Sequence, residues 1–282
     1  MKKPKLLAMD LDGTLFNEDS TVSEKNREAI SDAQKAGVEI AISTGRPYIG
    51  LPLSYMEEAQ IRYAITTNGA AVYRYEGNGQ RTCLFSQCMS REKIAEILPF
   101  LLGKRMHFDV FIDGDGFSDQ RCRRYIDDLP MPLSLRNYIR DSRNVVEDII
   151  AVTTLSSRNV QKITMNFPRD EQEGARREVL EFFSADPYFR VVSGGFSNLE
   201  LTRQDVSKAA ALEKLAEHLG FSLSDTMAIG DSGNDLDMIR AAGTGVAMGN
   251  GEEATRAAAD YVTLSNREDG VAAVIRLFLS EP

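Results

Sequence analysis

The sequence has few cysteines, no long apolar run and fewer basic than acidic side chains. Its three cysteines, Cys83, Cys88 and Cys122, have neither the even number of a disulfide framework nor the spacing of a metal site. We therefore expect reduced thiols and a cytoplasmic protein. No stretch approaches the length of a membrane span, and residues 1–9 lack the pattern of a signal peptide, so we expect no membrane partner.

The charge balance narrows the classes of partner. The 33 basic and 42 acidic residues give a formal net charge of −9, which disfavours nonspecific binding to nucleic acid or to an anionic membrane. An anionic small molecule stays possible, because basic residues inside a pocket decide its binding. The 282 residues, 43% of them hydrophobic and 27% charged, are typical of a globular protein with one large domain or two ordinary ones.

Short apolar segments alternate with helical patterns in both terminal parts of the chain. Strands are expected at residues 5–9, 38–42, 63–67, 225–229, 245–248 and 261–263. Helices are expected from Ser23, which can cap the first turn, to about Ala36, and from Ser207 to His218. Gly37 and Gly220 are the expected stops of these helices. This alternation predicts an α/β fold with a Rossmann-like parallel sheet flanked by helices.

The regular alternation of expected strands and helices ends in the middle of the chain. Expected elements there are helices at 90–104 and 169–183, a hairpin at 108–117, and strands at 162–167, 189–192 and 198–201. This order favours an α+β unit inserted into the α/β domain. We predict a core domain of residues 1–82 and 204–282, and an inserted domain of residues 83–203.

Two aspartates, Asp10 and Asp12, end the first expected strand and precede Gly13 and Thr14. Alternate residues of an extended chain point the same way, so both carboxylates can address one point beyond the strand. Because adjacent carboxylates repel each other, the pair predicts a bound divalent cation, or two carboxyl groups of which one carries a proton. The plainer interpretation is a polar junction between strand and loop, since Asp and Gly are common in turns.

Other strands also end in polar clusters, and ligands of an open parallel sheet bind beyond these ends. Thr44 and Gly45 offer a hydroxyl and a backbone N–H at a helix start, which suits phosphate, although such turns are also routine. Asn68 ends the strand at 63–67. Lys208 lies near a helix start, where a lysine is usually solvated.

Residues 230–235 form the second acidic cluster. Asp231 and Asp235 lie in a glycine-rich turn with Asn234, at the same expected sheet edge as Asp10. Hard cations such as Mg2+ take oxygen ligands, which these side chains can supply. An acidic helix cap is the alternative for this stretch alone.

Together these residues resemble the motifs of the haloacid-dehalogenase-like hydrolases. The matching positions, in the order of the four motifs of that family, are Asp10, Asp12, Gly13 and Thr14; Thr44, Gly45 and Arg46; Lys208; and Gly230, Asp231, Asn234 and Asp235. The chain is most similar to the Cof-type sugar-phosphate phosphatases, whose type IIB cap the insert resembles. Residues 246–250 and 266–271 are also typical of that group, whereas Ala209 replaces its usual glycine.

The resemblance implies a Mg2+-dependent phosphatase for small phosphorylated metabolites, with sugar phosphates as the expected substrates. It implies that Asp10 attacks phosphorus to form an aspartyl-phosphate, and that Asp12 protonates the leaving group and then activates water. It further implies that Asp10, the Asp12 carbonyl and Asp231 hold the metal, and that Asp235 orients the metal site. The phosphoryl oxygens would be held by Thr44, Gly45, Lys208 and Asn234. Arg46 and Asn68 would make contacts with the substrate or contacts that form on closure.

Two alternatives to the phosphatase stay open. One is a phosphosugar mutase, since capped relatives include such enzymes. The other is a phospho-accepting module similar to receiver domains, which also carry an aspartate nucleophile, acidic Mg2+ ligands, a Thr or Ser and a Lys on a parallel sheet. Asp12 and the insert count against the receiver, because an acid/base group shortens the life of a phospho-aspartate.

Overall fold

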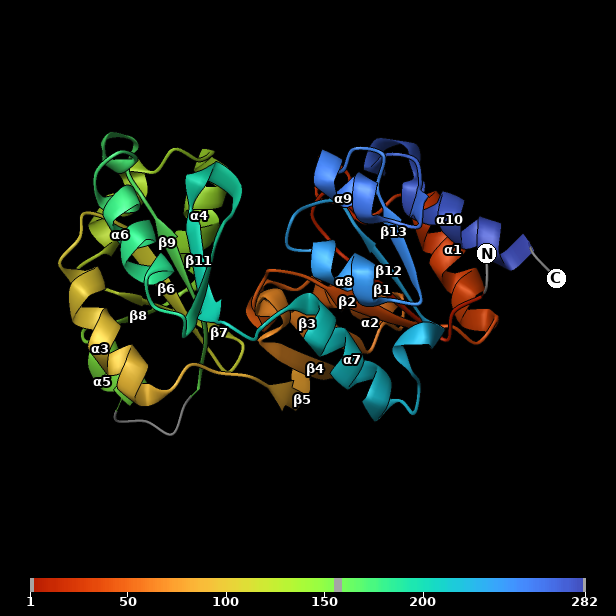
Figure 1. Cartoon of the computed structure of the whole chain (residues 1–282), viewed down its shortest axis with the longest axis horizontal. Helices are drawn as coiled ribbons and strands as arrows, with labels where there is room; N and C mark the ends of the chain where they lie inside the picture. The colour runs from red at the N-terminus through yellow and green to blue at the C-terminus, as the bar shows by residue number, and fades with distance from the viewer. Residues whose placement is uncertain (1–2, 155–158, 281–282) are drawn as a thin grey trace. The chain divides into compact units, whose positions relative to one another are not determined.

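The computed structural model describes residues 3–154 and 159–280 (Figure 1). The chain forms two compact units. The first, called the core unit, comprises Met1–Arg46, Gly50–Phe85 and Ser207–Pro282, and the second, called the inserted unit, comprises Pro47–Ile49 and Ser86–Val206. Residues 47–49 belong to the inserted unit, which the sequence did not indicate.

The core unit is built on a sheet of eight strands in the order β14-β13-β12-β1-β2-β3-β4-β5. Its strands are β1 (Leu6–Met9), β2 (Glu39–Ser43), β3 (Tyr63–Thr66), β4 (Ala71–Gly77), β5 (Gln80–Ser86), β12 (Thr226–Gly230), β13 (Thr244–Ala247) and β14 (Tyr261–Val262). β1 lies in the middle and pairs in parallel with both β12 and β2. The predicted α/β fold with a parallel sheet is confirmed. The antiparallel pairing of β4 with β3 was not predicted.

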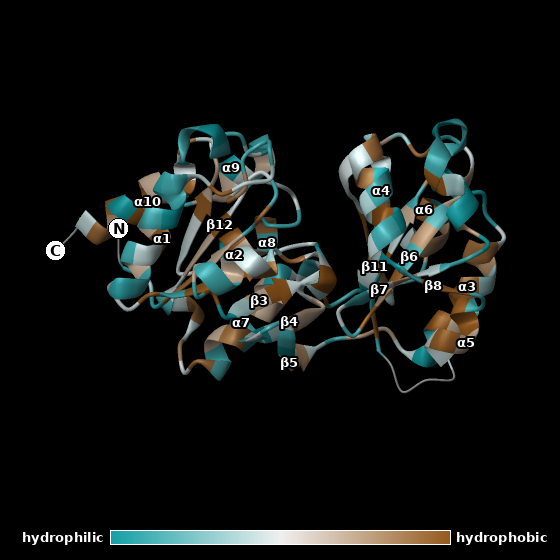
Figure 2. Cartoon of the chain, turned by 180° about the vertical axis from the view of Figure 1, so that it is seen from behind, coloured by the Kyte–Doolittle hydropathy of each residue, from teal (hydrophilic) through white to brown (hydrophobic). Residues whose placement is uncertain are grey.

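Helices flank this sheet because its central strands, such as β1 and β12, are apolar and buried. The helices are α1 (Glu24–Lys35), α2 (Leu53–Glu58), α7 (Lys208–His218), α8 (Leu236–Ala241), α9 (Glu253–Ala258) and α10 (Gly270–Ser280). Leu212 and Leu215 of α7 belong to one buried hydrophobic cluster with Leu6 and Ala8 of β1. On α7 the side chain of Ser207 caps the first turn by accepting a hydrogen bond from the N–H of Ala210. Figure 2 shows hydrophobic residues on β12 and hydrophilic ones on α9.

The inserted unit has a sheet of six strands in the order β10-β11-β9-β6-β7-β8. Its elements are α3 (Arg91–Leu102), β6 (His107–Ile112), β7 (Asp115–Asp119), α4 (Leu133–Ser142), β8 (Asn144–Val146), α5 (Ile149–Thr154), β9 (Val160–Asn166), α6 (Ala175–Ser184), β10 (Phe189–Ser193) and β11 (Leu199–Arg203). One face packs Phe108, Val110 and Ile163 against Ile94 of α3 and Phe183 of α6. The expected helix over 169–183 is wrong in its first turn, since residues 169–171 form a separate 3-10 turn before α6.

The chain enters and leaves the inserted unit beside one residue, Tyr188. The Tyr188 hydroxyl accepts a hydrogen bond from the N–H of Ser90 at 2.6 Å, and its carbonyl accepts one from the N–H of Gln204 at 2.9 Å. The two ends of the long insertion are therefore neighbours. Within the described ranges, no helix combines the length and the apolar character needed to cross a membrane.

Candidate active site

Asp10 lies directly beyond the end of β1, and its side chain is almost completely buried. Its N–H donates to the carbonyl of Ile229 on the neighbouring β12 at 3.0 Å, which extends the sheet pairing as far as this residue. Gly13 then turns the chain with φ 86°, and a Cβ at this position would lie 2.5 Å from Oδ2 of Asp231. Glycine is required here because the loop after β1 and the loop after β12 touch.

Lys208 joins two of the acidic residues. Its Nζ donates to Oδ1 of Asp10 and to Oδ1 of Asp235, both at 2.6 Å, and all three side chains are buried. The start of α7 is held in place by Gly69, where a Cβ would lie 2.1 Å from the Ser207 carbonyl oxygen. Lys208 is thus an interior residue, and the alternative of a solvated surface lysine is excluded.

Three carboxylates gather at this point. Asp10, Asp231 and Asp235 offer oxygen atoms that lie within 4.8 Å of one another. Oδ1 of Asp231 accepts a hydrogen bond from the Thr14 hydroxyl at 2.8 Å. Oδ2 of Asp235 accepts from the N–H groups of Asp231 and Ser232 at 3.0 and 3.1 Å, so it also fixes the turn that carries Asp231. The contact of Asp235 with Lys208 was not predicted.

The charges of this cluster are not balanced. Burial raises the pKa of Asp10 to about 8, although Lys208 acts in the opposite direction. Burial also raises the pKa of Asp231 to about 6. For Lys208 burial acts to lower the pKa, but Asp10 and Asp235 outweigh it, so the pKa is raised. One lysine among three carboxylates leaves a deficit of positive charge, which a divalent cation would fill.

The side chain of Asp12 does not join the cluster. It is 54% exposed and forms a two-pronged ion pair with Arg46, whose Nε and Nη2 donate to Oδ2 and Oδ1 at 2.7 and 2.5 Å. The Arg46 guanidinium also lies over the ring of Phe16, 5.3 Å from its centre. Of the four aspartates expected around the metal, Asp10, Asp231 and Asp235 therefore meet through their side chains. The fourth, Asp12, was expected to contribute its backbone carbonyl and not its carboxylate.

Three loops meet here, and they carry residues expected to hold phosphate, Thr44, Gly45 and Asn234, and one expected to contact the substrate, Asn68. The Asn234 side chain donates to Oδ1 of Asn68 at 3.2 Å, and a Cβ on Gly45 would lie 2.8 Å from the same oxygen. The N–H of Asn68 donates to the carbonyl of Thr44 at 3.2 Å. Thr44 is buried, and its hydroxyl accepts from the N–H of Arg46 at 3.2 Å. The structure thus brings Gly45, Asn68 and Asn234 together.

Sequence reasoning missed the role of Gly69. Asn68 and Gly69 both have positive φ, 59° and 100°, and this turn carries Gly69 against the start of α7. The available signal was the Asn-Gly pair directly after a strand, since both residues tolerate the left-handed region. What the pair contacts could not be seen locally, because Ser207 lies far along the chain.

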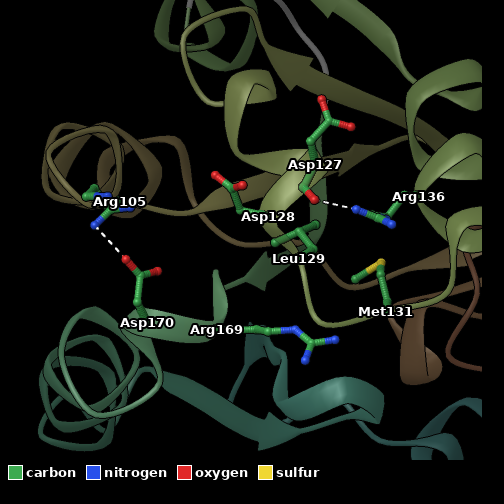
Figure 3. A pocket seen from close by; sticks show the side chains of 8 residues that line it. All are labelled: Arg105, Asp127, Asp128, Leu129, Met131, Arg136, Arg169 and Asp170. Atoms are coloured by element: carbon green, nitrogen blue, oxygen red, sulfur yellow. Dashed lines mark hydrogen bonds and ion pairs between the residues drawn. The ribbon is translucent and has the colours of Figure 1, made fainter.

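A pocket of about 460 Å³ lies in the inserted unit, as Figure 3 shows. Its lining is mixed in charge and consists of Arg105, Asp127, Asp128, Leu129, Met131, Arg136, Arg169 and Asp170. Arg105 donates to Asp170 at 3.0 Å, and Arg136 donates to the carbonyl of Asp127. Two of its three arginines are thus already engaged by neighbours, and nothing in this pocket matches the charge deficit of the Asp10 cluster.

A parallel sheet whose carboxyl edge gathers a buried aspartate, a lysine and further carboxylates belongs to the class of α/β enzymes that act on anionic groups. The sequence pattern of the haloacid dehalogenase-like hydrolases matches residues 7–275. The chain belongs to this family, and it is a phosphatase of the family, as the resemblance implied.

Relatives and solved structures agree with this assignment. The chain is 30% identical to phosphatase YwpJ of Bacillus subtilis over 98% of this chain and 100% of that protein. It is 31% identical to the 5-amino-6-(5-phospho-D-ribitylamino)uracil phosphatase YcsE of the same organism, over 96% of this chain and 94% of the relative. Among solved structures it is similar to the subclass IIB sugar phosphatase BT4131, with a TM-score of 0.78, 25% identity and coverage of 97% and 98%.

Proposed function

We propose that this phosphatase hydrolyses phosphomonoesters of small metabolites, sugar phosphates above all, with Mg2+ and through an aspartyl-phosphate on Asp10. The observation that carries the proposal is the buried cluster in which Lys208 bridges Asp10 and Asp235 beside Asp231. A buried carboxylate that a lysine holds in one orientation is prepared to attack, because it needs little reorganisation.

The reaction would proceed in two displacements. A carboxylate oxygen of Asp10 bonds to phosphorus while the bond to the leaving oxygen breaks, and that oxygen takes a proton from Asp12. Asp12 then accepts a proton from water, whose oxygen bonds to phosphorus as the bond to Asp10 breaks and phosphate leaves. Asp12 must release Arg46 before it can carry a proton, because both of its carboxylate oxygens accept hydrogen bonds from that guanidinium.

The donor set fits Mg2+. Asp10, Asp231 and Asp235 offer hard oxygen ligands in one place, and the raised pKa values of Asp10 and Asp231 mark a site short of positive charge. In this proposal Asp10, Asp231 and the carbonyl of Asp12 would hold the ion, and Asp235 would orient the site. When bound, the ion would offset the charges of phosphate and of Asp10 so that the two anions can meet.

The phosphoryl group would be held by residues of the core unit. Thr44, Gly45, Lys208 and Asn234 would contact its oxygens, and Arg46 and Asn68 would contact the substrate or take part in closure. The meeting of Gly45 with Asn68 and Asn234 supports this assignment.

The choice of substrate is assigned to the inserted unit, which we propose to be a type IIB cap. Support comes from the similarity to BT4131, which is named a sugar phosphatase, and to YcsE, which is named for a phosphorylated ribityl compound. The net charge of −9 agrees with a small anionic substrate recognised by local basic groups rather than with nucleic acid. A cytoplasmic location is part of the same proposal, and the absence of any disulfide among the three cysteines supports it.

A phosphatase assay on a panel of phosphorylated metabolites tests the proposal. We expect free phosphate from sugar phosphates in the presence of Mg2+, none in EDTA, and none from Asp10→Asn. Asp32→Asn, which changes an exposed aspartate of α1, is the matched control and should keep wild-type activity. Transfer of the phosphoryl group to a second sugar hydroxyl would show a mutase instead, and stable labelling of the protein would show a phospho-accepting module.

A further inference from the structure

Two asparagines outside the family's four motifs hold the loop that carries Asp12. The side chain of Asn250 donates to the carbonyl of Gly13 at 2.8 Å, and the side chain of Asn266 donates to the carbonyl of Phe16 at 2.9 Å. The Asn250 side-chain oxygen accepts from the N–H of Asn266 at 2.8 Å, so the two amides form one chain of hydrogen bonds. Two loops from the far end of the sequence thereby fasten both sides of the turn after β1.

The loop that carries Asn250 is itself fastened to the second acidic turn. The N–H of Glu252 donates to the carbonyl of Asp231 at 2.8 Å, and a Cβ on Gly251 would lie 3.0 Å from that oxygen. The loop after β13 therefore makes two contacts. Its residue Glu252 binds the turn of Asp231, and its residue Asn250 binds the carbonyl of Gly13. It sets the spacing between the two acidic loops.

Both asparagines act on Asp12 by separate routes. Asn250 binds the carbonyl of Gly13 and so fixes the peptide group between Gly13 and Thr14, one residue beyond Asp12. Asn266 fixes Phe16, whose ring lies under the Arg46 guanidinium that holds the Asp12 carboxylate. We infer that Asn250 and Asn266 are positioning residues for the acid/base group Asp12, an inference that rests on the proposed phosphatase mechanism.

Near-isosteric variants test this inference without opening a cavity. Asn250→Asp keeps the oxygen that faces Asn266 but replaces the donor to Gly13 with an acceptor, and Asn266→Asp does the same opposite Phe16. Asn137→Asp on α4, an exposed asparagine of the inserted unit, is the matched control. Each variant is assayed with p-nitrophenyl phosphate, whose leaving group needs little protonation, and with the best alkyl phosphate of the panel.

Misplacing Asp12 should harm the reaction with the poorer leaving group more. We expect Asn250→Asp and Asn266→Asp to lower kcat on the alkyl phosphate about tenfold more than on p-nitrophenyl phosphate, with KM changed less than about twofold. In the metal-free protein, amide hydrogen exchange of residues 11–17 should become faster in both variants and stay unchanged in Asn137→Asp.

An unchanged ratio between the two substrates would overturn the inference, whatever the size of the loss, because a merely structural role lowers both rates alike. Unchanged exchange at residues 11–17 would overturn it as well. If the wild-type protein released phosphate from no ester, the proposed function would fail by itself, and the exchange measurement would still report whether the two asparagines hold the loop.

Discussion

The two units each bury an aspartate, and the two aspartates differ in what surrounds them. Asp109 of β6 accepts from Arg143 Nε at 3.1 Å and from the Ser118 hydroxyl at 2.5 Å, and it lies 3.1 Å from Nε2 of His107. Burial acts to raise the pKa of Asp109, but Arg143 and His107 together hold it well below its usual range. Asp10 shares its single lysine with Asp235, and its pKa is raised to about 8.

Burial alone therefore does not distinguish a structural from a functional carboxylate. The charge of Asp109 is fully compensated by its neighbours within the inserted unit, so it stabilises the fold and offers nothing to a ligand. The charge of the Asp10 cluster is left short of a cation, which is a state that a folded protein tolerates where a ligand completes it. Substitutions at the two positions should separate stability from chemistry.

The largest effect is expected for Asp10→Asn. Loss of the proposed nucleophile should lower kcat by at least about 10³-fold, because in this mechanism the remaining groups only bind and polarise the substrate. The free energy of unfolding should stay the same or increase, since the change removes a buried charge that lacks full compensation. Phosphate release and denaturant unfolding measure the two quantities. Substantial residual turnover would contradict the covalent mechanism.

Asp109→Asn should show the reverse pattern. It leaves the buried Arg143 without its carboxylate and removes the group that keeps His107 protonated, so we expect the free energy of unfolding to fall by about 3–5 kcal/mol. Activity per folded molecule should change far less than in Asp10→Asn. Unfolding followed by circular dichroism checks this, with Asp141→Asn on α4 as an exposed control. Equal stability of both variants would show that the Asp109 network is not compensated as described.

Mg2+ should stabilise the protein through the core unit alone. A ligand present at about 100 times its Kd adds about 2.7 kcal/mol to the free energy of unfolding. Asp231→Asn should lose this gain, whereas Asp32→Asn should keep it. Thermal unfolding with and without Mg2+ measures the difference. A gain that survives in Asp231→Asn would place the cation elsewhere.

The smallest effect concerns pH and the inserted unit. Burial acts to lower the pKa of His107, but Asp109 outweighs it and the pKa rises from 6.5 to about 9. The stabilisation of the folded state by protonated His107 is thus fully present below pH 6.5 and is lost as the pH rises towards about 9. The groups facing His107 are Asp109, Ser118 and Cys122, and Asp109 is ionised across this range. We therefore expect Tm to fall between pH 6.5 and about 9, and to fall less steeply in His107→Gln. An equally steep fall of Tm in that variant would show that other groups cause the pH dependence.

The parts of the site that follow from local pattern could be predicted from sequence. Asp10 and Asp12 end an apolar strand, and the polar turns at Thr44, Asn68 and Asp231 end its neighbours, so strand geometry alone placed them at one edge. The turn of the Asp12 side chain towards Arg46 could not be predicted, because rotamer choice depends on a partner 34 residues away.

The inserted unit was less predictable for a related reason. His107 and Asp109 alternate on β6 and so share a face, but their partner Arg143 comes from the end of α4 and gives no local signal. Long-range pairing decides such contacts, and a single sequence does not display it.

In the core unit, the hairpin of β4 and β5 was also missed. Its strands have a mixed sequence without an apolar run, although Asn78 and Gly79, a pair typical of two-residue turns, separate them.

Because both ends of the insertion meet at Tyr188, the segment of residues 86–206 could be replaced by the corresponding segment of a relative through two neighbouring junctions. Every acidic residue of the cluster, and Lys208, is encoded outside this segment. Under the function proposed above, a gene that joins the core unit of this chain to the corresponding segment of a relative should keep the proposed catalytic groups while acquiring another substrate-contacting unit. In that proposal, specificity can change by recombination at two neighbouring points, without any change in Asp10, Asp231, Asp235 or Lys208.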